Sequence, residues 1–280
     1  MILALIVVSF LVFQRNHPNI SQPKAKSITS SICIGNDRKN CLAPFKRFDS
    51  KYRISRKYKL LSCVIEKNMS TILAAIICFL FDEEAFQQAN RSITTDLYEE
   101  RFCKNKNEYF TAQQIVKDTK ISLGDWTMFT VARDPIDRFL SGYVNKCILE
   151  TKRNRYPNKC YGCGKNLSCF VDKQFERAQK YVTGKIRQWS YEDIHFYPQN
   201  WHCEFHTNIH HYHIVQYATD TSERYEKMLQ ELANILEISG VNRNTVEKIT
   251  KEIRESRTAH ATFNSPQRAQ QQTTLNLLRH

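Results

Sequence analysis

The sequence predicts an α/β fold in which a central, mostly parallel sheet is flanked by helices. Two stretches carry this prediction, because each reads as a buried strand, a polar turn and then a helix. The first runs from Leu60 to Phe81 and the second from Thr127 to Cys147. A strand that leads through a turn into a helix is the unit from which parallel sheets are built. The C-terminal third adds two helical patterns, at residues 223–238 and 246–253.

The second stretch, TMFTVARDPIDRFLSGYVNKC, begins as an apolar strand that ends near Ala132. Asp134 is a good N-cap, and Pro135 occupies the first helical position, where its missing N–H costs nothing. Apolar residues then recur at helical spacing, while Arg138, Ser141 and Asn145 share the other face.

Arg133 stands directly before the start of this helix. Unpaired N–H groups, the helix dipole and an arginine fork together make an anion site, most naturally for a phosphate. The alternative interpretation is a capped turn with a local ion pair, because short motifs often occur by chance.

The first stretch resembles a phosphate cradle. The apolar run LLSCVI suits a buried strand, EKNM suits a turn, and STILAAIICFLF is apolar on all sides and suits a buried core helix. Backbone N–H groups and the hydroxyls of Ser70 and Thr71 can hold oxygen atoms, and Lys67 supplies charge. The chain has no GxxxxGK[ST] motif and only 7 glycines, which argues against a P-loop nucleotidase or a Rossmann dehydrogenase.

The full pattern R-D-P-x-x-R-x-x-S-x-Y at Arg133–Tyr143 resembles the 3′-phosphate-binding segment of the Golgi carbohydrate sulfotransferases, which include the chondroitin 4-O-sulfotransferases. The resemblance implies a P-loop-like sulfotransferase fold and the sulfate donor PAPS (3′-phosphoadenosine 5′-phosphosulfate), with no metal. It also implies that Arg133 and Ser141 hold the 3′-phosphate of the donor.

The turn at Lys67–Thr71 is similar to the 5′-phosphosulfate loop of the same family, in which a lysine is followed by a small residue and threonine. The resemblance gives Lys67, Ser70 and Thr71 the donor-binding roles and makes Lys67 catalytic as well. Met69 stands where the family often has glycine, which is a departure from the pattern.

A third similarity lies in HFYPQNWHCEF, because many chondroitin-type enzymes carry a His-x-x-Pro-Gln segment there. His195 is the candidate general base, since a neutral imidazole can take the proton of an attacking sugar hydroxyl. The alternative is a structural histidine bonded to the backbone. Pro198 and Cys203 are expected to be structural.

Five histidines crowd into the next segment, at positions 202, 206, 210, 211 and 213. A spacing of four can place two imidazoles on one helical face as zinc ligands. The segment has no HExxH motif and no helical periodicity, so solvated loop histidines are the preferred interpretation and no metal is expected.

The formal net charge of +13 indicates an anionic partner. A glycosaminoglycan such as chondroitin fits this charge, and nucleic acid binding is the competing class of function. The densest basic run, at Lys46–Lys59, is expected to be a solvated arm.

The expected organisation has four parts: a signal-anchor or signal peptide at 1–20, a basic stem at 21–58, the PAPS-dependent domain at 59–260 and a polar tail at 261–280. The apolar run from Met1 to Phe13 is too short for a comfortable membrane span and has no preceding positive charge. Cleavage, anchoring or a truncated start all remain open. The family resemblance implies a single-pass type II Golgi membrane protein with a lumenal domain, or a secreted form.

The 10 cysteines suit an oxidising compartment. Those that flank and occupy the loop CYGCGKNLSC favour disulfides, with a zinc knuckle at Cys160 and Cys163 as the alternative. Cys63 and Cys78 are expected to be free thiols in the core. Glycosylation sequons occur at Asn19, Asn68, Asn90 and Asn166, and a glycan at Asn68 would contradict the donor-loop assignment.

These expectations combine into one hypothesis: transfer of a sulfuryl group from PAPS to a hydroxyl of chondroitin, at the 4-O position, in proteoglycan synthesis. The resemblance also suggests that Arg257 or Thr258 approaches the donor. A catalytically inactive glycan-binding protein on the same scaffold is the main alternative, favoured by Met69.

Overall fold

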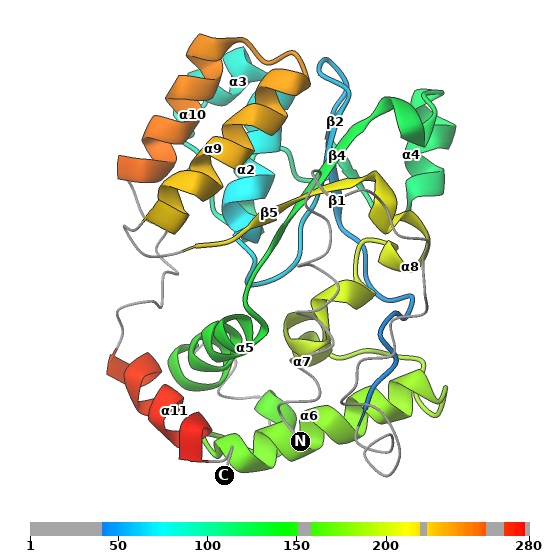
Figure 1. Cartoon of the computed structure of the whole chain (residues 1–280), viewed down its shortest axis with the longest axis vertical. Helices are drawn as coiled ribbons and strands as arrows, with labels where there is room; N and C mark the ends of the chain where they lie inside the picture. Colours follow the sequence, from blue (N-terminus) through cyan, green and yellow to red (C-terminus); the bar gives the residue numbers. More distant parts are fainter. Residues whose placement is uncertain (1–40, 151–157, 219–222, 256–265, 278–280) are drawn as a thin grey trace. The chain divides into compact units, whose positions relative to one another are not determined.

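The computed structural model describes residues 41–150, 158–218, 223–255 and 266–277. These residues form two compact units (Figure 1). The sheet unit comprises the described residues of 47–133 and 202–261, and the helical unit comprises those of 1–46, 134–201 and 262–280. The first twenty residues, Asn19, Arg257 and Thr258 lie outside the described residues.

The sheet unit contains a five-stranded sheet in the order β3-β1-β2-β4-β5. Its strands are β1 (Tyr52–Ser55), β2 (Leu60–Cys63), β3 (Glu108–Tyr109), β4 (Thr127–Ala132) and β5 (Tyr212–Gln216). Strands β2, β4 and β5 run parallel, whereas β1 pairs antiparallel with both β2 and β3. The predicted α/β class with a central sheet flanked by helices is confirmed. The sheet was expected to be mostly parallel, but it has parallel and antiparallel strand pairs in equal number, because β1 runs opposite to both of its neighbours.

Helices cover this sheet because their apolar faces need a partner. The longer ones are α2 (Ser70–Phe81), α4 (Ala112–Thr119), α9 (Glu223–Ile238) and α10 (Arg243–Glu255), with shorter α3 (Glu83–Gln88), α8 (Phe205–Asn208), η3 (Tyr98–Glu100), η4 (Leu123–Asp125) and η8 (Ile209–His211). Figure 1 shows α2, α9 and α10 together on one side of the sheet. The nine residues from Ile72 to Leu80 are all buried, so the apolar helix predicted after Met69 is a core helix.

The helical unit is built around α5 (Pro135–Tyr143), which continues as the π-helix η5 (Val144–Leu149). Its other elements are η6 (Lys159–Gly162), α6 (Leu167–Val182), α7 (Tyr191–Phe196), η7 (Gln199–Trp201) and α11 (Pro266–Leu277). An aromatic cluster on α5, α6 and α7 forms its core, with the rings of Phe170 and Phe196 4.6 Å apart. The expected polar tail at 261–280 therefore contains a helix, and Arg268 of α11 pairs with Asp137 of α5.

The expected basic stem at 21–58 overlaps the folded domain. Strand β1 lies inside it, with all four residues buried. The physical reason is that Arg53, which reads as part of a solvated charge run, is only 2 % exposed and is neutralised by Glu108 of the neighbouring strand. The local sequence around Arg53 does not predict its pairing with Glu108.

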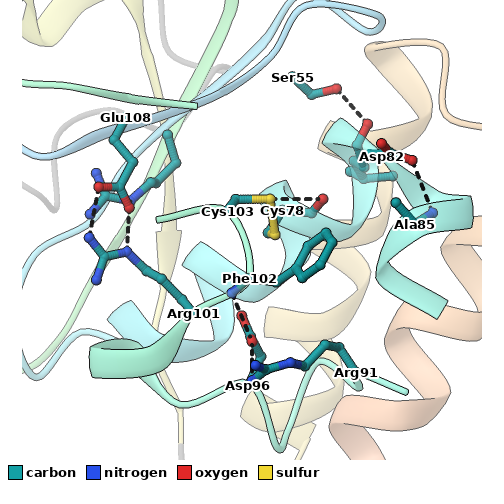
Figure 2. The surroundings of a disulfide bond; sticks show 12 residues. Ser55, Cys78, Asp82, Ala85, Arg91, Asp96, Arg101, Phe102, Cys103 and Glu108 are labelled. Atoms are coloured by element: carbon teal, nitrogen blue, oxygen red, sulfur yellow. Dashed lines mark hydrogen bonds and ion pairs between the residues drawn. A yellow bond between two sulfur atoms is a disulfide. The ribbon is translucent and has the colours of Figure 1, made fainter. Parts of the chain in front are cut away.

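Disulfides pin both units. Cys147 pairs with Cys160 and Cys163 with Cys169, as the preferred interpretation of that loop requires, and the zinc-knuckle alternative is wrong. The expectation of free thiols at Cys63 and Cys78 is also wrong, because these residues pair with Cys203 and Cys103. Figure 2 shows the Cys78–Cys103 bond beside Phe102, whose backbone N–H donates to the buried carboxylate of Asp96. The apolar sequence around Cys63 and Cys78 does not reveal their partner cysteines, which lie 140 and 25 residues further along the chain.

The C-terminal helices follow their sequence patterns. Helix α9 has the predicted bounds and ends before Gly240, whose φ of 86° lies in the left-handed region that favours glycine. Helix α10 extends the predicted 246–253 helix at both ends. Within the described part of the chain, no helix combines the length and apolar character needed to cross a membrane.

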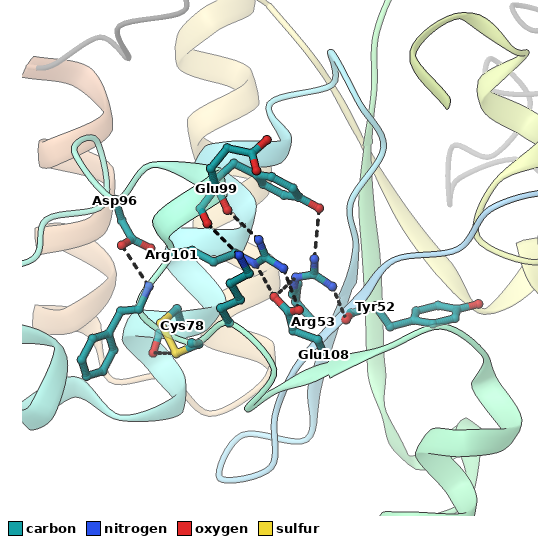
Figure 3. A network of polar contacts seen from close by, with 11 residues as sticks. Tyr52, Arg53, Cys78, Asp96, Glu99, Arg101 and Glu108 are labelled. Atoms are coloured by element: carbon teal, nitrogen blue, oxygen red, sulfur yellow. Dashed lines mark hydrogen bonds and ion pairs between the residues drawn. A yellow bond between two sulfur atoms is a disulfide. The ribbon is translucent and has the colours of Figure 1, made fainter. Parts of the chain in front are cut away.

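A buried charge network stabilises the β1–β3 edge of the sheet (Figure 3). Glu108 accepts from Arg101 through both carboxylate oxygens, and Arg53 Nε lies 3.3 Å from Glu108 Oε1. Arg53 also donates to the carbonyl of Tyr52 and to the hydroxyl of Tyr98. Burial alone would raise the pKa of Glu108, but the two guanidiniums outweigh it and hold that pKa below its usual value.

We expect Glu108→Gln to lower the free energy of unfolding by roughly 3–5 kcal/mol, because it leaves two buried guanidiniums without a counter-charge. Since the folded pKa is depressed, the contribution of the pair is present above the ordinary pKa of glutamate and is lost on acidification through the folded pKa. Denaturant unfolding at neutral and acidic pH measures both effects. The matched control is Glu226→Gln, whose pair with Arg254 is about half exposed, so its loss should change the free energy of unfolding far less. Equal losses in the two variants would contradict this assignment.

We expect Gly142→Ala in α5 to destabilise the helical unit. An added Cβ would lie 2.9 Å from Phe196 Cε1 and 3.2 Å from Cζ, and the surrounding aromatic cluster leaves the ring little room to move. The overpacking penalty, roughly 1–3 kcal/mol, should exceed the gain in helix propensity of up to about 1 kcal/mol. Thermal unfolding checks this against Gly124→Ala, where the new Cβ meets nothing within 4 Å. A melting temperature for Gly142→Ala at or above that of the wild type would refute the expectation.

Candidate functional site

The turn between β2 and α2 has an unusual backbone. Lys67 and Met69 adopt left-handed conformations, with φ of 67° and 63°, although neither is glycine. Such conformations cost of order 1–3 kcal/mol each and persist only where the surroundings impose them. Met69 therefore takes a conformation for which glycine is favoured, and the chain forms this tight turn without a glycine.

Helix α2 starts at Ser70 directly after this turn. Its N-cap residue, Met69, makes no side-chain cap, and its first turn has no acidic residue. Ser70 and Thr71 occupy its first two positions and are partly exposed. A helix N-terminus of this kind directs N–H groups and the positive end of the helix dipole toward an anion, and the hydroxyls and Lys67 add donors.

Two contacts fix the turn to the end of β4. Arg133, which follows β4 directly, donates from Nη1 to the carbonyl oxygen of Lys67 at 2.9 Å. Asn68 donates from Nδ2 to the carbonyl oxygen of Val131, also at 2.9 Å. Parallel pairing of β2 with β4, with Leu60 opposite Thr127, brings the two strand ends together. Lys67 and Arg133, selected from separate motifs, thus lie side by side.

Arg133 is itself held in one orientation. Its side chain is almost buried, at 6 % exposed, and its guanidinium carbon lies 4.7 Å from the centre of the Tyr217 ring. Tyr217 follows β5, and its N–H donates to the carbonyl of Ala132 at 2.7 Å. A cation stacked on an aromatic face and bonded to a carbonyl loses little further freedom when it binds an anion.

An ionic cluster of Lys51, Asp49 and Glu66 adjoins the turn. Lys51 Nζ lies 3.1 Å from Asp49 Oδ2 and also pairs with Glu66, the residue before Lys67. Burial alone would lower the pKa of Lys51, but the carboxylates of Glu66 and Asp49 outweigh it and raise that pKa, so the amine stays protonated. Sequence reasoning missed Lys51, Glu66 and Asp49, because the pairing depends on the β-strand register rather than on a local motif.

His202 is buried, unlike the other four histidines of its segment. Candidate ligand atoms of Asp49, Glu66 and His202 lie within 4.8 Å of one another, and the ammonium of Lys51 pairs with both carboxylates. The ring of Phe48 meets His202 edge-on at 5.1 Å. The remaining four, at 206, 210, 211 and 213, are exposed as expected, but they lie in α8, η8 and β5 rather than in a loop.

Ser141 belongs to the helical unit. Asp134 caps α5 by accepting from the N–H of Asp137 at 2.9 Å, and Pro135 occupies the first helical position, as predicted. Ser141 is 5 % exposed. Arg138, expected beside it on a polar face, is also buried and donates from Nη1 to the carbonyl of Tyr197 at 2.9 Å. Arg138 thus ties α5 to the end of α7.

His195 lies on α7 of the same unit and is 8 % exposed. Its Nδ1 is 2.7 Å from the carbonyl oxygen of Tyr191, one turn earlier. A carbonyl only accepts, so Nδ1 carries the proton and, in the neutral ring, the lone pair is on Nε2. The backbone bond is the one that the structural alternative expects, and Nε2 is the nitrogen that a general base would use.

The sequons differ in exposure. Asn68 has no exposed surface, and its amide donates to Val131, so the folded chain offers no room for a glycan there. Asn90 and Asn166 are exposed, and Asn166 accepts through Oδ1 from Cys169 as the N-cap of α6. The conflict between a glycan at Asn68 and the anion-binding turn does not arise in the folded protein.

Comparisons with known proteins identify the family of the chain. The model of the family described as "Sulfotransferase family" matches residues 50–279. A Caenorhabditis elegans protein named carbohydrate sulfotransferase chst-1 is 38 % identical over 233 residues, which cover 81 % of this chain and 69 % of that protein. The putative sulfotransferase vep-2 of the same organism is 31 % identical over 247 residues, covering 87 % of this chain and 75 % of vep-2. No solved structure matches. The chain belongs to the sulfotransferase family.

Proposed function

We propose that this protein transfers a sulfuryl group from PAPS to a sugar hydroxyl of a glycosaminoglycan, with the 4-O position of chondroitin as the specific candidate, in proteoglycan synthesis. The observation that carries the proposal is the hydrogen bond from Arg133 to the carbonyl of Lys67. This bond joins two strand ends, each of which has the chemistry of a phosphate site.

The residues of the turn fit the donor. PAPS carries two anionic ends and supplies an activated sulfuryl group. Lys67, Ser70 and Thr71 form one cationic and hydroxyl-rich position at the N-terminus of α2, whose first turn has no acidic side chain. Arg133 and Ser141 are the residues proposed for the 3′-phosphate. Holding a donor at both ends turns a chance encounter into a positioned reaction.

Two side chains have proposed chemical roles. Lys67 offsets the negative charge that develops on the departing phosphate, as cations do in phosphoryl transfer. His195 takes the proton of the acceptor hydroxyl at Nε2, because Nδ1 donates to Tyr191. No step requires a metal ion.

The acceptor and the location are proposed from chemistry. The relative chst-1 is named a carbohydrate sulfotransferase, and a net charge of +13 favours an acidic polysaccharide. Four disulfides among the described residues favour an oxidising compartment, consistent with the Golgi lumen. Exposed sequons at Asn90 and Asn166 suit a glycoprotein. Membrane anchoring through the first twenty residues completes the proposed type II topology.

One alternative rests on a specific observation. Met69 puts a bulky side chain into the left-handed turn, close to where the donor would bind. A scaffold that binds glycans without modifying them would tolerate this. Binding of PAP, the product left after transfer, distinguishes the two functions.

The central experiment measures transfer of labelled sulfate from PAPS to chondroitin, dermatan, desulfated heparin and N-glycans, together with calorimetric binding of PAP. We expect transfer to chondroitin, and kcat/KM lower by roughly 10²–10³-fold in Lys67→Ala and Arg133→Ala, the usual cost of losing one group that stabilises developing charge. Lys117→Ala, an exposed lysine on α4, is the control and should be unaffected.

Each outcome of this experiment decides something. A wild-type protein that transfers sulfate to none of the acceptors and also does not bind PAP would support the inactive glycan-binding alternative. PAP binding that survives in both variants would show that the donor occupies another place in the molecule.

Lys51 is a positioning residue for Lys67 in this proposal, because it anchors Glu66 one residue away. We expect Lys51→Met to weaken PAP binding about tenfold, as expected when a binding group is displaced slightly. The two buried carboxylates that remain should also lower the free energy of unfolding by roughly 3–5 kcal/mol. Lys51→Arg keeps the charge and should restore both quantities.

The control for this variant is Lys57→Met, whose pair with Glu83 is largely exposed. It should change the free energy of unfolding by less than about 1 kcal/mol and leave PAP binding intact. A Lys51→Met protein that is folded at the assay temperature and binds PAP as tightly as the wild type would leave Lys51 with a structural role alone.

A further inference from the structure

The loop between α6 and α7 presents an exposed tryptophan. Trp189 is 50 % exposed, whereas Trp126 and Trp201 are 5 % and 0 % exposed. Indole is a large apolar surface with one N–H donor, and tryptophan is enriched at binding interfaces, where one end of the ring is apolar and the other is wet. The position of Trp189 immediately before α7 places it in the segment that leads to His195.

Two cations precede Trp189 in the same loop. Lys185 and Arg187 are exposed, residues 183–190 contain no acidic side chain, and neither cation has a carboxylate partner among the described residues. The lysines of the preceding helix behave differently, because Lys173 and Lys180 both pair with Glu176. The loop therefore carries two positive charges without local compensation, next to an aromatic ring.

The backbone on both sides of Trp189 is fixed. Arg177 binds the carboxylate of Asp193 through Nε and Nη2, and its Nη2 also donates to the carbonyl of Gln188 at 3.4 Å. Ser190 and Asp193 form a reciprocal capping box at the start of α7. Gln188 and Ser190 are thus both anchored, so ordering the loop adds little entropic cost to binding.

We propose that Trp189, Lys185 and Arg187 form an acceptor subsite for an anionic carbohydrate chain. The indole face packs against the C–H face of a pyranose ring, and the guanidinium and ammonium groups bind carboxylate or sulfate substituents on neighbouring sugars. The inference rests on the proposed function and deepens it, because it assigns the recognition of acidic sugar polymers to the loop before α7. A single aromatic ring with a half-buried Ile186 offers too little apolar surface for stable insertion into a membrane.

The test measures binding of unsulfated chondroitin chains to the full-length protein, by calorimetry at several salt concentrations. We expect Trp189→Ala and the double variant Lys185→Ala/Arg187→Ala each to bind about tenfold more weakly, as for anchors of intermediate strength. The double variant should also show a shallower dependence on salt, because fewer counterions are exchanged. Trp189→Phe, which keeps an aromatic face, should retain most of the affinity.

Matched controls remove the same chemistry elsewhere. Phe110→Ala deletes another exposed aromatic side chain, 58 % exposed, and Lys117→Ala/Lys227→Ala deletes two exposed lysines. Both should bind chondroitin like the wild type, and PAP binding should be unchanged in every variant. In transfer assays the loop variants should raise the KM for chondroitin while kcat with a saturating acceptor stays constant.

The outcomes separate this inference from the proposed function. A wild-type protein that binds chondroitin through Trp189 but neither binds PAP nor transfers sulfate sustains the subsite and refutes the enzyme. Chondroitin affinity that is unchanged in the loop variants, or equally reduced in the controls, refutes the subsite. Trp189-dependent binding to anionic phospholipid vesicles or to single-stranded RNA, without binding to chondroitin, would assign the loop to a different partner.

Discussion

Parallel pairing of β2 with β4 is the constraint on which the turn at Lys67–Thr71 depends. Neighbouring parallel strands end at the same edge of a sheet, so the turn after β2 and the residue after β4 meet without any further chain movement. The side chain of Arg133 donates to the carbonyl of Lys67, and the side chain of Asn68 donates to the carbonyl of Val131. These cross-strand bonds supply the external support that two left-handed, non-glycine residues need.

Buried charge is the second organising feature of the sheet unit. Arg53 with Glu108, and Lys51 with Glu66, both lie on or next to β1, in a run that looks solvated in the sequence. Each pair loses hydration on folding, and the loss is compensated only when the strand register is correct. The pairs therefore favour the observed alignment of β1 with its neighbours over shifted alignments. Apolar contacts alone would distinguish these alignments less sharply.

Local patterns predicted a large part of the molecule. The two strand–turn–helix segments, the Asp134 cap and helix α9 all follow from apolar spacing and capping chemistry, which act over a few residues. The partners of Cys63 and Cys78, the burial of Arg53 and the role of Lys51 could not be predicted, because each depends on a residue brought close by the sheet. The adjacency of Lys67 and Arg133 could be predicted in part. It follows from the two local motifs only when their strands are also taken to be neighbours in a parallel sheet.

The burial of Asn68 has a consequence for how the chain matures. Its sequon is intact, and the amide is protected only once β4 has paired beside β2 and Val131 has arrived to accept its hydrogen bond. In a compartment that attaches glycans to emerging chains, folding and glycosylation compete for the same nitrogen atom. A sugar attached first would keep the turn from closing against β4. In such a compartment, the share of chains that complete the β2–β4 pairing would depend on how early β4 docks.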